Sequence, residues 1–249
     1  MSYPNVHFGN EGEQYNTYST ERWPVGTKMM LQDGRTFQFA EAGAVALAAG
    51  VLCQSEVPDA DHDTLAVAAA GAVGDKFVTI TNGVDTIEAN LYAGGYLCVE
   101  AAAGTGEGVV YKIANAHDAI ANATNGTIPL ERGLAIALNT SSTVTLVKHP
   151  CRDILIHPSP PTANVVGVTA TAIAANKFGW IQTGGVACCL IDGTVVIGQS
   201  VMPSNGTDGS VKAWGLTEGT PNVEITPAIG RVVEVAPTGD SGLINLIAF

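Results

Sequence analysis

Short runs of alternating apolar and polar residues follow one another from Lys28 to the end of the chain. Gly, Asn, Asp or Pro bounds nearly all of them, and this pattern is typical of β-strands joined by turns. Asp33-Gly34, between the apolar runs of KMMLQDGRTFQF, is the strongest hairpin signal. No amphipathic segment of three helical turns stands out, and residues 44–51 would form a helical turn at most. We therefore expect strands at residues 76–81, 96–99, 109–113, 144–147, 179–182, 186–191, 211–214, 231–235 and 243–247.

The two halves of the chain resemble each other in three blocks that occur in the same order. The matching blocks are DKFVTITNG (75–83) with NKFGWIQTGG (176–185), GTGEGVVYKI (104–113) with GTDGSVKAW (206–214), and GLAIALNTSSTVTLV (133–147) with GRVVEVAPTGDSGLINLI (230–247). Chance similarity of Gly- and Thr-rich strands is the alternative, but the common order favours a duplication. We therefore expect an all-β fold of two related small β-barrel or β-sandwich-like modules, residues 29–148 and 165–249. Residues 149–164 would be a connector, because their four prolines disfavour regular sheet pairing.

The first 28 residues differ from the rest, since they are polar and carry isolated aromatic residues without strand or helix period. A segment that cannot form its own core needs another surface for such side chains. We expect residues 1–28 to be an extended N-terminal arm that docks on its own body or on a neighbouring subunit. A disordered tail is the alternative. The candidate interaction residues are Tyr3, Phe8, Tyr15, Tyr18 and Trp23.

The composition limits the possible partners. Charged residues make up only 14 % of the chain against the roughly 25 % usual for soluble domains, so neutral polar residues must cover much of the surface. The formal net charge of -12 leaves no basic stripe for a nucleic acid. The longest apolar stretch is too short to span a bilayer, and the start MSYPNVHFGNEGEQ has no features of a signal peptide. We therefore expect no nucleic-acid partner, no membrane and no secretion.

Residues 239–242 spell GDSG, the letters that surround the nucleophile of trypsin-like serine proteases. Such an enzyme also needs an upstream histidine and aspartate, and further strands after the serine. Only seven residues follow Gly242, and no histidine lies in a segment that resembles that family's histidine motif. We therefore interpret Ser241 as a turn residue, predict no catalytic residue and expect the protein not to be an enzyme.

Two further features could hold a metal ion. PDADHD (58–63) gathers acids and a histidine in one loop but lacks the other ligands of a calcium loop, so a solvated acidic turn is preferred to a weak cation site. His149 and His157 flank the connector without ligands at suitable spacing, and we interpret them as linker residues. The five cysteines form no C-x-x-C pair, which favours buried free thiols. We predict neither a metal site nor a cofactor.

The run KFGWIQTGGVACCLIDGTVVIGQSVMPSNGTDGSVKAW (177–214), followed by AIGRVVEVAPTGDSGLINLIAF (228–249), resembles the C-terminal part of capsid decoration, or cement, proteins of tailed bacteriophages. Upstream, VGTKMMLQDGRTFQFAEAGAVALAAGVLCQS (25–55) is similar to the opening of the same proteins. The matched blocks span most of residues 25 to 249. Each motif is moderately specific, because glycine turns and apolar strands are common.

The resemblance implies a structural virion protein that assembles in the host cytoplasm and binds the outer surface of an icosahedral head. Its partners would be the major capsid protein, whose neighbouring subunits it ties together, and copies of itself in a homotrimer. A receptor- or glycan-binding tail fibre or spike protein is the alternative, with Trp214 as a residue on which a sugar could stack. An enzyme is the third class.

Overall fold

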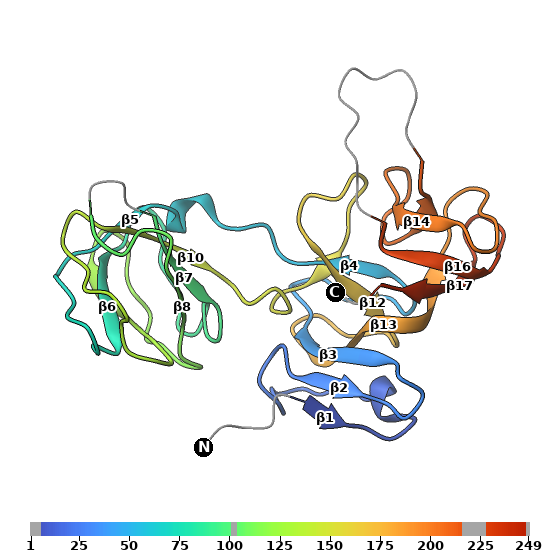
Figure 1. Ribbon diagram of the computed structural model, residues 1–249, viewed down its shortest axis with the longest axis horizontal. Helices are drawn as coiled ribbons and strands as arrows, with labels where there is room; N and C mark the ends of the chain where they lie inside the picture. The colour runs from blue at the N-terminus through green and yellow to red at the C-terminus, as the bar shows by residue number, and fades with distance from the viewer. Residues whose placement is uncertain (1–5, 101–103, 216–227, 248–249) are drawn as a thin grey trace. The chain divides into compact units, whose positions relative to one another are not determined.

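The computed structural model describes residues 6–100, 104–215 and 228–247 (Figure 1). These residues form strands in several sheets and two short 3-10 helices, η1 (Glu13–Tyr15) and η2 (Ala60–His62). The predicted all-β class is therefore confirmed. None of the described sheets closes into a barrel, so the architecture is sandwich-like and not barrel-like. No helix in the described part of the chain is long and apolar enough to cross a membrane.

The chain divides into two compact units, and the second is inserted into the first. Unit 1 comprises Met1–Val57 and Pro150–Phe249, and unit 2 comprises Pro58–His149. These boundaries differ from the predicted modules, because residues 29–57 pair with strands from the C-terminal part of the chain. Of the expected connector at residues 149–164, residue 149 ends unit 2, and residues 150–164 belong to unit 1, where they contribute a strand.

Unit 1 is built on one large sheet. Its strands are β1 (Val6–Phe8), β2 (Lys28–Met30), β3 (Thr36–Glu41), β4 (Leu52–Gln54), β11 (Leu155–Ile156), β12 (Val165–Thr169), β13 (Phe178–Leu190), β14 (Ser200–Pro203), β15 (Val211–Ala213), β16 (Gly230–Glu234) and β17 (Ser241–Leu246). The main path runs β1-β2-β3-β13-β17-β16-β14-β15, and β4, β11 and β12 pair beside it. The long strand β13 joins two regions, because its first half pairs with β3 and its second half with β17. A register shift between Gln182 and Gly184 bends β13 at this change of partner.

The core of unit 1 consists of three clusters of buried side chains. The cluster around β13, β16 and β17 includes Cys189, Ile191, Val201, Val232 and Ile244. The cluster around β4 and β12 includes Leu47, Cys53, Ile154, Ile173 and Ile181. An aromatic cluster comprises Met29, Leu31, Phe37, Phe39, Phe178 and Trp180, with Tyr18 and Trp23 packed against it. Alternate residues of β3 face this aromatic cluster, as the period of two along the strand requires.

Unit 2 has two sheets around a core of its own. Its strands are β5 (Leu65–Ala66), β6 (Phe77–Thr81), β7 (Tyr96–Val99), β8 (Val110–Lys112), β9 (Asn125–Pro129) and β10 (Thr143–Val147). One sheet has the order β5-β10-β7-β8, and β6 pairs with β9 in the other. The core includes Ile80, Ile87, Leu97, Ile113, Ile128, Val144 and Leu146, all fully buried.

The strand pairing does not support two copies of one topology. The hairpin β7–β8 of unit 2 corresponds to β14–β15 of unit 1. Of the strands in the matching sequence blocks, β13 pairs with β17 in unit 1. Their counterparts β6 and β10 pair with other strands, β6 with β9 and β10 with β5 and β7. The expectation that both modules share one set of strand pairs is therefore wrong.

Both units contain a pair of short turns of similar conformation, and the two turns of each pair are joined by backbone hydrogen bonds. In unit 1, Leu47 and Ile173 exchange two backbone hydrogen bonds of 2.8 and 2.9 Å. In unit 2, Ile87 and Ile120 do the same at 3.0 and 2.8 Å. The third residue after each of these four has a left-handed backbone: Gly50, Asn176, Asn90 and Ala123. We call these elements paired turns. Each buries one apolar side chain and reverses the chain within a few residues.

Candidate interaction site at the N-terminal segment

The N-terminal segment, residues 6–28, is docked on unit 1. β1 pairs in parallel with β2, and the Gly9 N–H donates to the Met30 carbonyl at 3.0 Å. Further along, Tyr18 and Phe178 exchange two backbone hydrogen bonds of 2.8 and 3.0 Å. We expected the arm to dock on its own body or on a neighbouring subunit, and the described part of the arm docks on its own body. Tyr3 lies outside the described residues.

Two of the predicted anchors, Tyr18 and Trp23, complete the aromatic cluster of unit 1. The Trp23 ring lies 5.3 Å from both Phe39 and Trp180, centroid to centroid, and 5.3 Å from Tyr18. Trp180 beneath them is fully buried. Edge-to-face packing of this kind stabilises beyond the area that it buries. The segment is therefore an integral part of unit 1 and not a separable arm.

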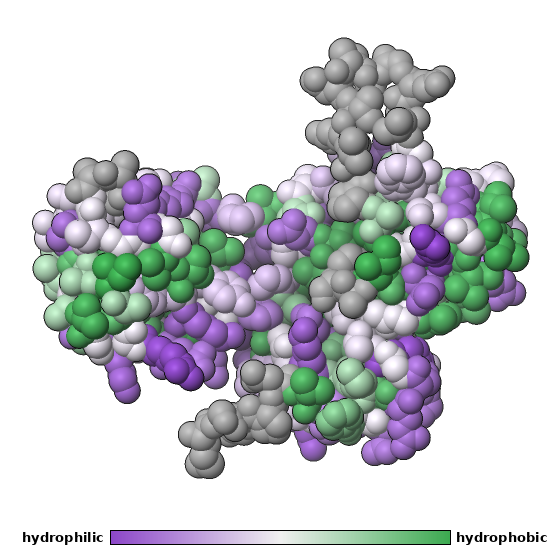
Figure 2. All heavy atoms as spheres, in the orientation of Figure 1, coloured by the Kyte–Doolittle hydropathy of each residue, from purple (hydrophilic) through white to green (hydrophobic). Residues whose placement is uncertain are grey.

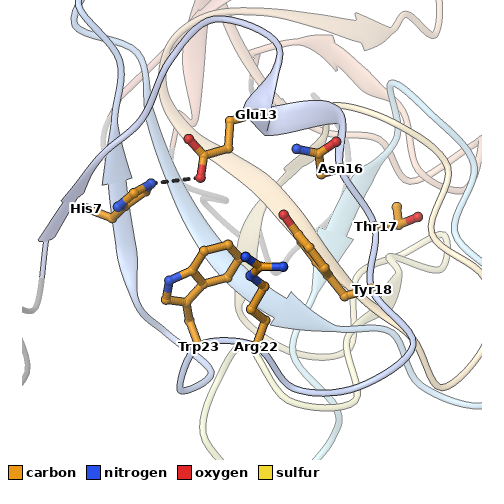
Figure 3. Close-up of a pocket in the computed structure, with 7 residues that line it drawn as sticks. All are labelled: His7, Glu13, Asn16, Thr17, Tyr18, Arg22 and Trp23. Carbon is orange, nitrogen blue, oxygen red and sulfur yellow. Dashed lines mark hydrogen bonds and ion pairs between the residues drawn. The ribbon is translucent and has the colours of Figure 1, made fainter.

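An open cleft of about 640 Å³ lies between η1 and the turn before β2 (Figure 3). We call it the aromatic cleft. It is lined by His7, Glu13, Asn16, Thr17, Tyr18, Arg22 and Trp23. The Arg22 guanidinium lies over the rings of both Trp23 and Tyr18, at 5.3 and 5.6 Å from the ring centres. Sequence reasoning found the two aromatic residues but missed the polar ones, which have no distinguishing spacing.

The acid in the aromatic cleft already has partners. The Glu13 carboxylate bonds to His7 Nε2 at 2.8 Å, and its other oxygen accepts from the Asn10 N–H at 3.3 Å. Within the described residues, the side chains of Asn16, Thr17 and Arg22 and the Tyr18 hydroxyl make no hydrogen bond or ion pair. These four groups are open to a ligand.

The two remaining predicted residues, Phe8 and Tyr15, are exposed. Phe8 is 76 % exposed and Tyr15 53 %. On the outer face of β1 and β2, Phe8 lies opposite Met30, and Val6 is two residues before Phe8 on the same side. We call Val6, Phe8 and Met30 the apolar edge. β1 ends the described sheet, so this edge combines apolar side chains with a strand that another chain can extend.

Ser241 opens β17 opposite Leu190, and the turn itself lies just before it, with a left-handed Gly239. The prediction that Ser241 is a turn residue is therefore wrong, because Ser241 is the first residue of the strand that follows the turn. It lines a hollow of about 330 Å³ together with Cys188, and no histidine is among the described residues of that hollow. The arrangement contains no base for a serine nucleophile.

Of the three histidines at the suspected metal sites, His62 and His157 are held by protein groups, and the ring of His149 stacks on Tyr96 at 6.2 Å between centroids. His62 is buried, with Nδ1 at 2.6 Å from the Tyr92 hydroxyl and 3.3 Å from Asp59. His157 is buried too, its Nε2 at 2.8 Å from the Ser210 carbonyl, so its interpretation as a linker residue is wrong. In the described ranges no group of three metal-ligating side chains comes together.

The cysteines are free thiols. Burial raises the pKa of Cys151 and that of Cys189 to about 12. It also raises the pKa of Cys53, and the neighbouring Cys189 adds to the effect. Cys188 is exposed, as strand alternation requires for a residue beside buried Cys189. Three of the five thiols are therefore buried and unreactive.

Comparison with known proteins gives no guide to this site: no family model, no curated protein and no solved structure matches the chain.

Proposed function

We propose that this chain is a structural virion protein that binds the outer surface of an icosahedral phage head. It cements neighbouring major capsid protein subunits there, as a homotrimer. The observation that carries the proposal is the apolar edge, where an exposed phenylalanine lies on a terminal strand. Exposed apolar groups on such a strand are typical of protein-protein contacts, and natural proteins otherwise protect them.

A second exposed apolar surface on unit 1 supports the same function. The backbone of Gly198 donates to the Val232 carbonyl at 2.8 Å, which brings the turn before β14 against β16. The exposed aliphatic residues there are Val196, Ile197, Val233 and Val235. Figure 2 shows hydrophobic residues in green at the right-hand edge of unit 1, the edge at which Figure 1 labels β14 and β16. A protein that ties two neighbours together needs two contact surfaces, and unit 1 offers both.

The composition supports the proposal as well. A surface covered mainly by neutral polar residues has little charge to desolvate when it packs in a lattice. The net charge of -12 keeps the protein away from packaged nucleic acid.

Binding to purified heads that lack the protein tests this function. In a co-sedimentation assay we expect Phe8→Asp to weaken binding about ten-fold or more, because burying a phenylalanine contributes about 1.5–3 kcal/mol. Folding should be unaffected, since Phe8 is exposed. Deletion of residues 2–24 is a poor test, because it also removes Tyr18 and Trp23 from the aromatic cluster.

Phe77→Asp is the matched control, because Phe77 is half-exposed and lies in unit 2. It should bind heads as the wild type does. Equal binding by Phe8→Asp and the wild type would remove the apolar edge from the proposal. Failure of the wild-type protein to bind any head would overturn the function itself.

A further inference from the structure

We propose that the aromatic cleft binds a saccharide that carries a single carboxylate. The carboxylate would pair with Arg22, the hydroxyls would bond to Asn16 and Tyr18, and the sugar ring would lie against the exposed part of the half-buried Trp23 side chain. This binding activity goes beyond the cementing role and does not depend on it.

Arg22 supplies the charge. Its guanidinium lies over two aromatic rings, and no acid of the described residues pairs with it. A guanidinium stacked in this way keeps its in-plane N–H donors for another acceptor, and a carboxylate fits them in a bidentate manner. Glu13, the acid among the residues that line the cleft, already bonds to His7 and to the Asn10 N–H.

The neutral groups indicate a ligand rich in hydroxyls. Asn16 and Tyr18 present an amide and a hydroxyl to one open cleft. Each such group can donate and accept, as sugar hydroxyls do. The half-buried Trp23 adds an apolar ring surface, and aromatic rings pack well against groups with one apolar and one polar side.

The cleft is held in position before any ligand binds. Both backbone hydrogen bonds between Tyr18 and Phe178 fix one wall, and Trp23 is wedged against Phe39 and Trp180. A preformed site loses less conformational entropy on binding than a flexible one.

The charge of the whole chain favours one carboxylate over many. With a net charge of -12, the molecule repels polyanions, so the isolated cation Arg22 selects a ligand with one negative group. An acidic peptide would need backbone partners in addition, whereas the cleft offers converging side chains.

Titration calorimetry with the full-length protein tests the proposal. The probes are sialyllactose and a glucuronyl disaccharide, each with one carboxylate, against lactose and a tripeptide with one glutamate. We expect at least one acidic saccharide to bind about ten-fold or more tightly than lactose, which has no carboxylate for Arg22, and than the peptide, which has no sugar hydroxyls for Asn16 and Tyr18.

Arg22→Gln should bind the acidic saccharide no more tightly than lactose, so that the difference in affinity of about ten-fold or more disappears. Arg132→Gln is the matched control, since it removes the same charge from an exposed position in unit 2. An unchanged unfolding midpoint would show that Arg22→Gln is folded, and Asn16→Ala provides a second variant on an exposed position. No binding of either acidic saccharide at millimolar concentration, equal binding by Arg22→Gln, or tighter binding of the peptide would each overturn the proposal.

Discussion

Trp23 packs in the aromatic cluster of unit 1. The sequence predicts that Trp23 is an anchor but does not predict the surface on which it packs. It was predicted as an anchor because an isolated aromatic needs a surface, and it does pack on one. Its partners Phe39 and Trp180 lie in strands far along the sequence. No local pattern could distinguish this internal surface from that of a neighbouring subunit. The same limit applies to Phe8, another isolated aromatic residue of this segment, which is exposed.

Trp23→Ala should destabilise unit 1 by about 2–4 kcal/mol, at the lower part of the range for a buried ring, because Trp23 is half-buried. Urea unfolding followed by circular dichroism measures the change. Tyr15→Ala, in the same segment but exposed, should stay within about 0.5 kcal/mol. Similar losses for the two variants would mean that Trp23 does not pack in the aromatic cluster.

The buried thiols make stability depend on pH in the alkaline range. Burial raises their pKa in the folded state above the ordinary value of 9.0, so folding keeps protons that the unfolded chain releases. Their contribution is complete below about pH 9 and is lost as the pH rises toward the folded-state pKa. Each thiol should lower the free energy of unfolding by about 1.4 kcal/mol per pH unit in that range. Unfolding experiments at pH 8, 9 and 10 should give a smaller slope for Cys189→Ala than for the wild type, and equal slopes would contradict this prediction.

At the scale of elements, several strands with clear alternation are predicted within a residue or so, whereas others, among them β4, β9 and β12, are missing from the prediction. β7 matches its predicted range, and β6, β8 and β10 agree within a residue or so at each end. β9 was missed because its sequence NGTIP contains residues typical of turns. β13 was predicted as two strands, because Gly184-Gly185 reads as a break and is a bend within one strand.

Three of the four paired turns place a non-glycine residue in the left-handed region, and a substitution by glycine would remove the steric cost of that conformation. Ala123 has a φ of 53° and is exposed, whereas Gly74 occupies a left-handed position with open space around it. Ala123→Gly should stabilise unit 2 by about 0.5–1 kcal/mol, because the left-handed conformation costs alanine about 1–2 kcal/mol and glycine loses part of that gain as entropy. The reverse change, Gly74→Ala, should destabilise by about 1 kcal/mol. Thermal unfolding of both variants checks the sign, and a loss of stability in Ala123→Gly would contradict the backbone assignment.

At the scale of the whole molecule, the all-β class followed from local alternation, but the division into units did not. The residues that decide it lie in pairings between distant segments, such as Trp180 opposite Phe39 in β13 and β3. The repeated blocks reflect similar strands and turns placed in different pairings. Likewise, the polar groups of the aromatic cleft come together only when η1 and the turn before β2 fold over unit 1.

Unit 2 should fold by itself, because residues 58–149 contain a complete core and both sheets. The isolated segment should unfold cooperatively in urea with the same midpoint as one of two transitions of the full chain. Residues 150–249 alone should not fold, since β13 loses β3 along its first half. A single transition of the full chain together with an unfolded isolated unit 2 would contradict the two-unit description.

The most direct test of the proposed function is the number of copies in the virion. Under the proposed function the chain is encoded by a phage, and quantitative mass spectrometry of purified particles of that phage would give its ratio to the major capsid protein. A cement protein that occupies the threefold or quasi-threefold positions of the head lattice should be present at a fixed ratio of the same order as the major capsid protein. A few copies per particle would indicate a fibre or spike protein, and absence from the particle would contradict a virion function altogether.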